Sequence, residues 1–171
     1  MQQSLRELAA RLGEALQRQG WQLALAESCT GGGIAQAVTD IAGSSEWFDR
    51  GFVTYSNAAK VEMLGVAQTT LEQFGAVSRE TALEMASGAL CHSHADLALA
   101  VTGIAGPGGG SAEKPVGTVF IAWQRRGEQG GCSRQLFVGN RQAVRLQTLE
   151  FCLRQALCLA TSSPSLHADS D

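Results

Sequence analysis

Apolar residues recur every three or four positions from Leu5 to Leu16, and this pattern ends before Gly20. The spacing places them on one face and predicts an amphipathic helix. A short apolar run at residues 21–26 (WQLALA) follows and predicts a buried strand. Polar residues and a run of glycines then separate this strand from a helical stretch at residues 34–39. A strand, a glycine turn and a helix in this order begin an α/β unit.

Strand-like and helix-like patterns continue along the chain. Strands are predicted at residues 51–55 (GFVTY), 97–101 (LALAV), 117–123 (GTVFIAW) and 132–138 (CSRQLFV). Helices are predicted at residues 58–64, from 69 or 70 to 75, after Ser78 and at 141–159, with Ser56, Ser78 and Asn140 as N-caps. The polar, glycine-rich segment 125–131 indicates an antiparallel hairpin. We therefore expect one α/β domain over residues 1–160, a three-layer α/β/α sandwich around a mixed sheet, and a disordered tail at residues 161–171.

Composition narrows the class of protein. The 171 residues are 44% hydrophobic and 17% charged, which excludes a wholly disordered chain. The net charge of -3 lacks the basic character of a nucleic-acid binder. No apolar run reaches the roughly 18 residues of a membrane span, and the charged N-terminus lacks the apolar core of a signal peptide. We expect a cytoplasmic protein without a nucleic-acid or membrane partner.

The cysteines argue against two kinds of site, whereas the glycines indicate where a ligand could bind. The five cysteines are odd in number and form no C-x-x-C pair, which argues against a disulfide framework and a zinc site. The glycines cluster at residues 31–33, 103–110 and 127–131, where backbone could approach a ligand. Ser28 stands where the first strand meets the first cluster, and backbone N–H groups at a helix N-terminus favour an anion there. Ser28 is therefore a candidate nucleophile, although Ser28 or Thr30 could simply cap the helix, and Cys29 is a second candidate.

Two further segments carry candidate chemistry. Lys60 follows Tyr55 by five residues, so both could face a crevice at the end of a strand. Lysine acts as a base when desolvation lowers its pKa from about 10.4, although a solvated surface lysine fits the same pattern. The loop from Thr102 to residue 110 follows an apolar strand, and Thr102 could hold a substrate or donate to an oxyanion. The loop matches neither a P-loop nor a dinucleotide fingerprint, and a flexible linker is the alternative.

Arg141 and Arg145 lie four residues apart on the last predicted helix. Two guanidinium groups on one face could clamp a phosphate or a carboxylate, although a plain surface pair has the same spacing.

Seven short motifs lie in a characteristic order. They are AESCTGG (26–32), IAGSSEWF (41–48), GFVTYSNAAK (51–60), GAVS (75–78), TGIAGP with GGS (102–111), KPVGTV (114–119) and GNR (139–141). Together they resemble the CinA C-terminal-domain family, and within it the stand-alone nicotinamide-nucleotide amidohydrolases, from Ser4 to about residue 160. The resemblance implies an α/β/α fold and hydrolysis of the carboxamide of nicotinamide mononucleotide to nicotinate mononucleotide and ammonia, with no metal or other cofactor.

The resemblance also implies roles for particular residues. Ser28 would be the nucleophile and Lys60 its base, with Ser45 in a Ser–Ser–Lys relay. Tyr55 and Thr102 would complete the catalytic set. The residues expected to bind substrate are Thr30, Gly31, Gly32, Gly103, Gly106, Arg141 and Arg145. From the requirements of amide hydrolysis, we expect backbone N–H groups of residues 30–33, or of Thr102 and Gly103, to bind the oxyanion. From sequence position alone, we expect the two arginines or the 106–110 loop to bind the phosphate.

The chain departs from the family pattern at two positions, with Gly108 and Asn140 where members often carry aspartate. The alternative function is a non-catalytic nucleotide-binding or protein-interaction module, because the same domain occurs inside larger CinA proteins. The joint presence of Ser28, Tyr55 and Lys60 favours the enzyme. The resemblance suggests a homo-oligomer, and we expect a dimer that uses the last helix and the strand with Trp123.

Overall fold

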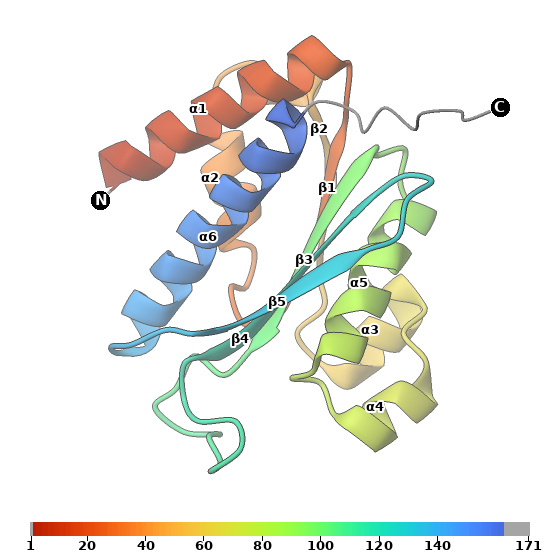
Figure 1. The fold of residues 1–171 in the computed structure, drawn as a ribbon, viewed down its shortest axis with the longest axis vertical. Coiled ribbons are helices and arrows are strands. Elements are labelled where there is room, and N and C mark those ends of the chain that lie inside the picture. Colours follow the sequence, from red (N-terminus) through yellow and green to blue (C-terminus); the bar gives the residue numbers. More distant parts are fainter. Residues whose placement is uncertain (1, 163–171) are drawn as a thin grey trace, which may run out of the picture.

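Helices cover both faces of a central sheet in the computed structural model, which describes residues 2–162 (Figure 1). The elements are α1 (Gln2–Gln19), β1 (Leu23–Glu27), α2 (Gly33–Thr39), the 3-10 turn η1 (Ser44–Glu46), β2 (Phe48–Val53), α3 (Asn57–Leu64), α4 (Gln68–Phe74), α5 (Arg79–Cys91), β3 (Leu97–Gly103), β4 (Thr118–Arg125), β5 (Gly131–Leu136) and α6 (Arg141–Thr161). The predicted three-layer α/β/α sandwich is confirmed. Of the predicted tail, only its first two residues are described: Thr161 ends α6 and Ser162 is its C-cap; residues 163–171 lie outside the described part.

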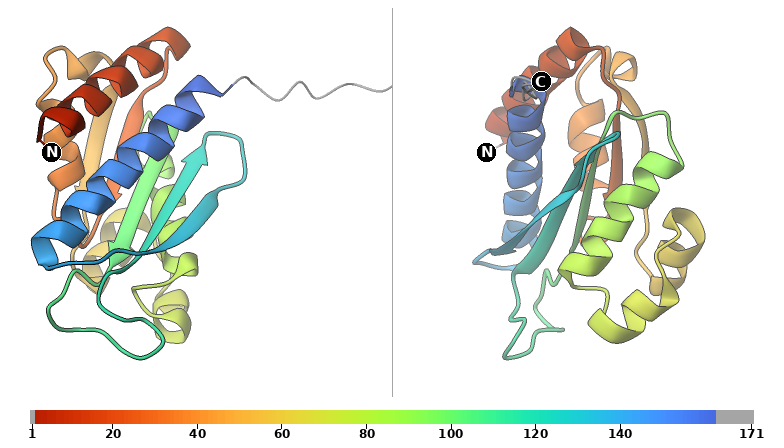
Figure 2. Two further views of the ribbon diagram at one scale, coloured as in Figure 1. Left: turned by 60° about the vertical axis from the view of Figure 1, so that its left-hand side comes forward. Right: turned by 45° about the vertical axis from the view of Figure 1, so that its right-hand side comes forward.

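The sheet is mixed, as the sequence predicts. Its strand order is β2-β1-β3-β4-β5. Strand β1 pairs in parallel with both β2 and β3, whereas β3, β4 and β5 pair antiparallel. Helices α1, α2 and α6 cover one face, and α3, α4 and α5 cover the other (Figures 1 and 2). The chain therefore leaves β1 toward one face, into α2, and leaves β2 toward the opposite face, into α3.

The sequence LALA in both β1 and β3 determines how closely the helices pack on each face of the sheet. Successive side chains of a strand point to opposite faces. Leu23 and Leu25 therefore belong to the core under α1, α2 and α6, whereas Ala24 and Ala26 belong to the core under α5. Large side chains fill the first interface, and small ones let α5 approach the sheet closely in the second.

Local sequence signals place the helix ends as predicted. The hydroxyls of Ser56 and Ser78 accept hydrogen bonds from backbone N–H groups in the first turns of α3 and α5, and Asn140 does the same for α6. Strand β2 was predicted at residues 51–55, but it begins at Phe48 and ends at Val53. It lies at the sheet edge, where Asp49 and Arg50 form an ion pair of 2.9 Å and interrupt the apolar pattern of the strand.

Within residues 2–162, no helix combines the length and apolar character needed to cross a membrane. The five cysteines are all free, which confirms the prediction that the chain has no disulfide framework. No group of three or more His, Cys, Asp or Glu side chains that could hold a metal ion occurs in the same residues.

Helices α3 and α5 pack with almost no clearance at Gly88. A Cβ atom added there would overlap the carbonyl oxygen of Leu64 and approach its carbonyl carbon at 2.8 Å. Helix α3 carries Lys60, so this contact fixes the depth at which that side chain enters the fold.

We expect Gly88→Ala to destabilise the protein, because the overlapping atom belongs to the backbone and cannot rotate away. An overpacked contact typically costs about 1–3 kcal/mol, which exceeds the roughly 1 kcal/mol that alanine gains over glycine inside a helix. Urea unfolding measures the difference. Ser87→Ala, on the exposed side of the same helix, is the control and should leave the midpoint unchanged. An unchanged midpoint for Gly88→Ala would contradict this packing.

Candidate active site

The carboxyl ends of β1 and β2 lie side by side, and the chain leaves these adjacent parallel strands toward opposite faces of the sheet. Ligand sites of open α/β sheets occur at such points. Ser28 directly follows β1, and Thr54 and Tyr55 directly follow β2. Lys60 lies in the first half of α3 and returns to the same place. The topology thus brings together residues that are 32 positions apart in sequence.

Ser28 and Lys60 are in direct contact. The Lys60 Nζ atom lies 3.1 Å from Ser28 Oγ and donates a hydrogen bond of 2.8 Å to the carbonyl oxygen of Thr54. Lys60 is 1% exposed and Ser28 is 8% exposed. The Thr54 carbonyl holds the amine in place while the second contact connects it to the hydroxyl. A neutral amine in this position could accept the Ser28 proton.

Burial favours that neutral state. Desolvation lowers the pKa of Lys60 below its usual 10.5, because a charged amine loses its hydration in the protein interior. No aspartate or glutamate within residues 2–162 forms an ion pair with Lys60 that would offset this loss.

Cys29, the second candidate nucleophile, is in a poor environment for that role. Burial raises the pKa of its thiol to about 11. The thiolate is the reactive form of cysteine, so Cys29 is protonated and unreactive near neutral pH. The contact of Ser28 with Lys60 and the raised pKa of Cys29 favour Ser28 as the candidate nucleophile.

The nucleophile turn, residues 28–33, depends on glycine. Gly31 and Gly32 have φ values of 58° and 94°, in the left-handed region that glycine enters without strain. The N–H of Gly31 donates to the Ser28 carbonyl, and that of Gly33 to the Thr30 carbonyl, both at 3.0 Å. These two of the predicted oxyanion donors are therefore used inside the turn. The N–H groups of Thr30 and Gly32 have no hydrogen-bond partner among the described residues.

Hydrogen bonds of Arg141 connect the loop that follows β2 with the loop that follows β3. Arg141 donates to the Tyr55 hydroxyl at 3.0 Å and to the Gly106 carbonyl at 2.8 Å. Tyr55 is 62% exposed. Its hydroxyl forms no hydrogen bond with Ser28 or Lys60 and accepts one from the Arg141 guanidinium instead. Arg141 thereby joins the β2–α3 loop, the β3–β4 loop and the start of α6.

Thr102 and Gly103 make other contacts than the oxyanion contacts that the sequence predicts. The Thr102 hydroxyl donates to the Ala76 carbonyl at 2.7 Å, so its proton is directed away from an oxyanion. Gly103 is the last residue of β3 and pairs with Val119 in the sheet. In this arrangement Thr102 anchors the segment between α4 and α5, because its hydroxyl proton is already bonded.

Arg145 lies one turn along α6 from Arg141 and binds a different segment. Its Nη2 donates to the Thr30 carbonyl at 2.9 Å. A cavity of about 210 Å³ beside it is lined by Thr30, Gly33, Gln36, Gln142, Arg145, Leu146 and Leu149. The two arginines thus approach the site from the same helix but hold different loops.

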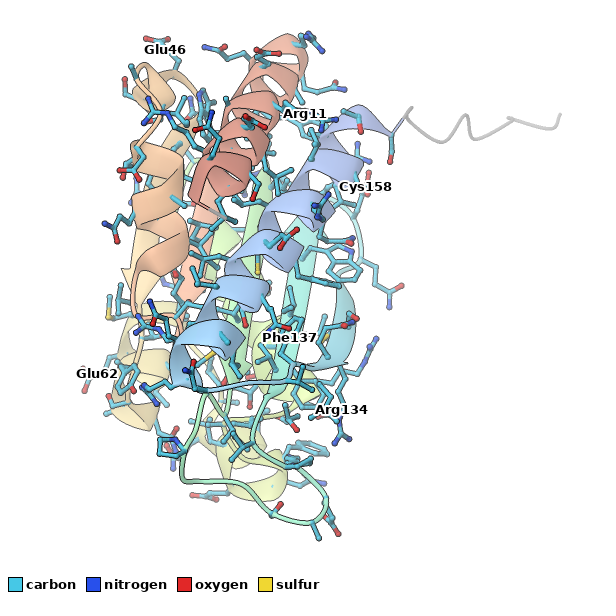
Figure 3. All side chains as sticks on the ribbon, turned by 90° about the vertical axis from the view of Figure 1, so that its left-hand side faces the viewer. Arg11, Glu46, Glu62, Arg134, Phe137 and Cys158 are labelled. Atoms are coloured by element: carbon cyan, nitrogen blue, oxygen red, sulfur yellow. The ribbon has the colours of Figure 1, made fainter. Side chains whose placement is uncertain are left out.

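The structure does not bring Ser45 together with Ser28 and Lys60 within the chain, so the Ser–Ser–Lys relay through Ser45 finds no support in these contacts and stays a prediction. Ser45 lies in η1, before β2, and is exposed. Leu23, the first residue of β1, hydrogen-bonds to Trp47 just after η1, whereas Ser28 follows the other end of β1. Their separation is about the length of β1, roughly 15 Å. In Figure 3, Glu46 of η1 lies at one end of the molecule and Glu62 of α3 lies toward the other.

Sequence reasoning missed Glu27, the residue directly before the candidate nucleophile Ser28. Its side chain is 1% exposed and accepts hydrogen bonds from Thr30, Ile34 and Ala35. The signal was present, because an ionisable residue that closes an apolar strand is rarely buried without a specific partner. Lys114, also left without a role, donates to the Val77 carbonyl at 2.5 Å and anchors the β3–β4 loop.

The fold and the site define an α/β protein with a buried serine–lysine pair at the carboxyl ends of parallel strands. Comparison with known proteins agrees with this class. The chain belongs to the CinA family: the model of the CinA C-terminal domain matches residues 5–159.

Named relatives cover nearly the whole chain. Nicotinamide-nucleotide amidohydrolase PncC of Enterobacter agglomerans is 58% identical over 90% of this chain and 93% of its own length. The protein of the same name from Escherichia coli K12 is 52% identical over 88% of this chain and 91% of its own length. Among solved structures, the competence/damage inducible protein CihA of Agrobacterium tumefaciens is 52% identical, with a TM-score of 0.88 over 91% of this chain and 94% of its own.

Replacing Lys60 by methionine should change how stability depends on pH. A lysine whose pKa is lowered by folding binds fewer protons in the folded than in the unfolded state. The wild type therefore gains stability as pH rises from the folded pKa to the unfolded value near 10.5. Lys60→Met lacks this gain, so its stability relative to the wild type should be greatest at low pH and fall toward pH 10.5. Urea unfolding from pH 6 to about 10 measures this, and parallel curves would contradict a lowered pKa.

Proposed function

We propose that the protein hydrolyses the carboxamide of nicotinamide mononucleotide to nicotinate mononucleotide and ammonia. The observation that carries the proposal is the buried contact of 3.1 Å between Lys60 Nζ and Ser28 Oγ. The substrate comes from the relatives, which are named nicotinamide-nucleotide amidohydrolase at 58% and 52% identity. Amide hydrolysis requires a nucleophile, a proton carrier and donors for the developing oxyanion.

The first half of the reaction transfers the acyl group to the protein. Ser28 Oγ forms a bond to the carboxamide carbon while Lys60 takes the hydroxyl proton directly, without a second serine. The amide C–N bond then breaks, and Lys60 returns the proton to the leaving nitrogen, which departs as ammonia. The acyl group stays on Ser28 as an ester.

The second half releases the acid. A water molecule gives a proton to Lys60 and attacks the ester carbon. The bond to Ser28 Oγ breaks, and the hydroxyl regains its proton from the amine. Lysine thus serves as base and acid in turn, which requires an amine that is neutral at the working pH. The lowered pKa of Lys60 supports this requirement.

The nucleophile turn supplies candidates for the oxyanion site. The N–H groups of Thr30 and Gly32 are the donors within residues 28–33 that the turn itself does not use. Such a donor contributes on the order of 3–4 kcal/mol to the transition state. We assign the substrate's phosphate to Arg141. This residue is exposed, and its guanidinium donates hydrogen bonds to both Tyr55 and Gly106. The 106–110 loop is the neighbouring backbone partner.

Self-association and location complete the proposal. Leu136 ends the edge strand β5 and Val138 lies two residues further on. They are 60% and 76% exposed, which supports a homodimer formed beside α6. The five free thiols are in keeping with a cytoplasmic protein.

The purified protein should release ammonia from nicotinamide mononucleotide, and Ser28→Ala should reduce the rate to background. Cys29→Ala is the matched control, one residue further along the same turn, and should keep most of the activity because its thiol is protonated. An enzyme-coupled ammonia assay measures both. Inactivity of the wild type would favour the binding-module alternative, and an active Ser28→Ala variant would assign the nucleophile elsewhere.

Lys60→Arg should be inactive, because a guanidinium stays charged and cannot take the serine proton. In the wild type, kcat/KM should rise with pH as Lys60 loses its proton, with an apparent pKa below 10.5. A pH–rate profile in the ammonia assay tests both statements. A rate near that of the wild type in Lys60→Arg would remove the general base from the proposal.

A further inference from the structure

We propose that Glu27 is a positioning residue that sets the geometry of the nucleophile turn; this inference rests on the proposed function. Glu27 is the last residue of β1 and directly precedes Ser28. Its carboxylate is buried, yet it forms no ion pair within residues 2–162. A buried carboxylate is unfavourable unless hydrogen bonds satisfy it, so its partners indicate its role.

All three partners belong to the turn or to the helix that follows it. Glu27 Oε1 accepts from the Thr30 hydroxyl at 2.7 Å and from the Ile34 N–H at 2.8 Å. Glu27 Oε2 accepts from the Ala35 N–H at 3.0 Å. The N-cap of α2 is Gly32, which has no side chain to accept these bonds. The carboxylate therefore folds the turn back onto the strand and caps α2 from a distance.

Thr30 is held from the other side as well. Its carbonyl accepts from Arg145 Nη2 at 2.9 Å, while its hydroxyl donates to Glu27. One residue of the turn is thus bound to β1 through its side chain and to α6 through its backbone. We call this set, Glu27, Thr30 and Arg145, the turn clamp.

The clamp acts on only one half of the catalytic pair. Lys60 is held by the Thr54 carbonyl. Thr54 in turn bonds to Glu27 only through the backbone, from its N–H to the Glu27 carbonyl at 2.9 Å, and a side-chain substitution at Glu27 leaves that bond in place. Loosening the turn clamp would move Ser28 and the Thr30 N–H relative to an amine that stays in place. Misalignment of reacting groups lowers the rate of the chemical step more than it lowers binding. The clamp also predicts that Arg145 positions the turn, whereas Arg141 contacts the phosphate.

Cysteine alkylation tests the clamp without any substrate. Cys29 is buried within the turn, and Cys152 is buried in α6. In Glu27→Gln, we expect the alkylation rate of Cys29 by iodoacetamide, resolved by mass spectrometry, to rise at least about fivefold while Cys152 stays unreactive. Glu46→Gln, an exposed glutamate at the other end of the sheet, is the matched control and should leave both rates unchanged. Equal rises at both cysteines would mean general unfolding, and no rise at Cys29 would mean that the turn does not need Glu27; either result overturns the proposal.

Kinetics then separate positioning from substrate binding. For Glu27→Gln, Thr30→Val and Arg145→Met we expect kcat to fall at least about tenfold with KM changed less than about twofold. The same fall should occur with nicotinamide riboside, the substrate without its phosphate. Arg145→Lys should restore part of kcat, since one donor to Thr30 remains. Arg141→Gln should instead raise KM for the mononucleotide only.

The two kinds of failure are distinguishable. Normal kcat in Thr30→Val and Glu27→Gln, or a KM effect of Arg145→Met confined to the phosphorylated substrate, overturns the clamp in an active enzyme. Absence of ammonia release by the wild type overturns the proposed function, and the alkylation measurement still decides whether Glu27 holds the turn.

Discussion

The contact between a buried amine and a serine hydroxyl depends on how the chain leaves two neighbouring parallel strands. Strand β1 delivers Ser28 and then turns to one face, and β2 delivers Thr54 and then turns to the other. Helix α3 brings Lys60 back between these exits, where the Thr54 carbonyl receives it. Burial in the same place also lowers the pKa of the amine.

Much of the architecture was predictable because its signals are local. The helical spacing in α1, the apolar strands and the caps at Ser56, Ser78 and Asn140 each act within a few residues. The start of β2 was not predictable in this way. Its pairing with β1 begins at Phe48, and the Asp49–Arg50 ion pair that follows breaks the apolar pattern. An edge strand is specified by its neighbour as much as by its own letters.

In the candidate site, too, local features were predictable from the sequence and contacts between distant segments were not. The local pattern placed Ser28 after a strand and Lys60 five residues after Tyr55, but their pairing as nucleophile and base was implied by the resemblance to the CinA family. Ser45 could not be placed, because its motif precedes β2 and lies at the opposite end of the sheet. The roles of Glu27 and Arg145 depend on contacts between elements that lie far apart in the chain, such as the bond from α6 to the Thr30 carbonyl. No spacing rule within one segment encodes such a contact.

The alternation of leucine and alanine in β1 and β3 gives the two cores unequal freedom to vary. On the leucine side, a smaller residue would leave a void that neighbouring side chains could partly fill. On the alanine side, each of these strand residues carries a single methyl group, and a larger side chain would push α5 away from the sheet. Sequence drift, natural or in a randomised library, should therefore be concentrated beneath α1 and α6. The layer that carries the lysine should remain the more uniform of the two.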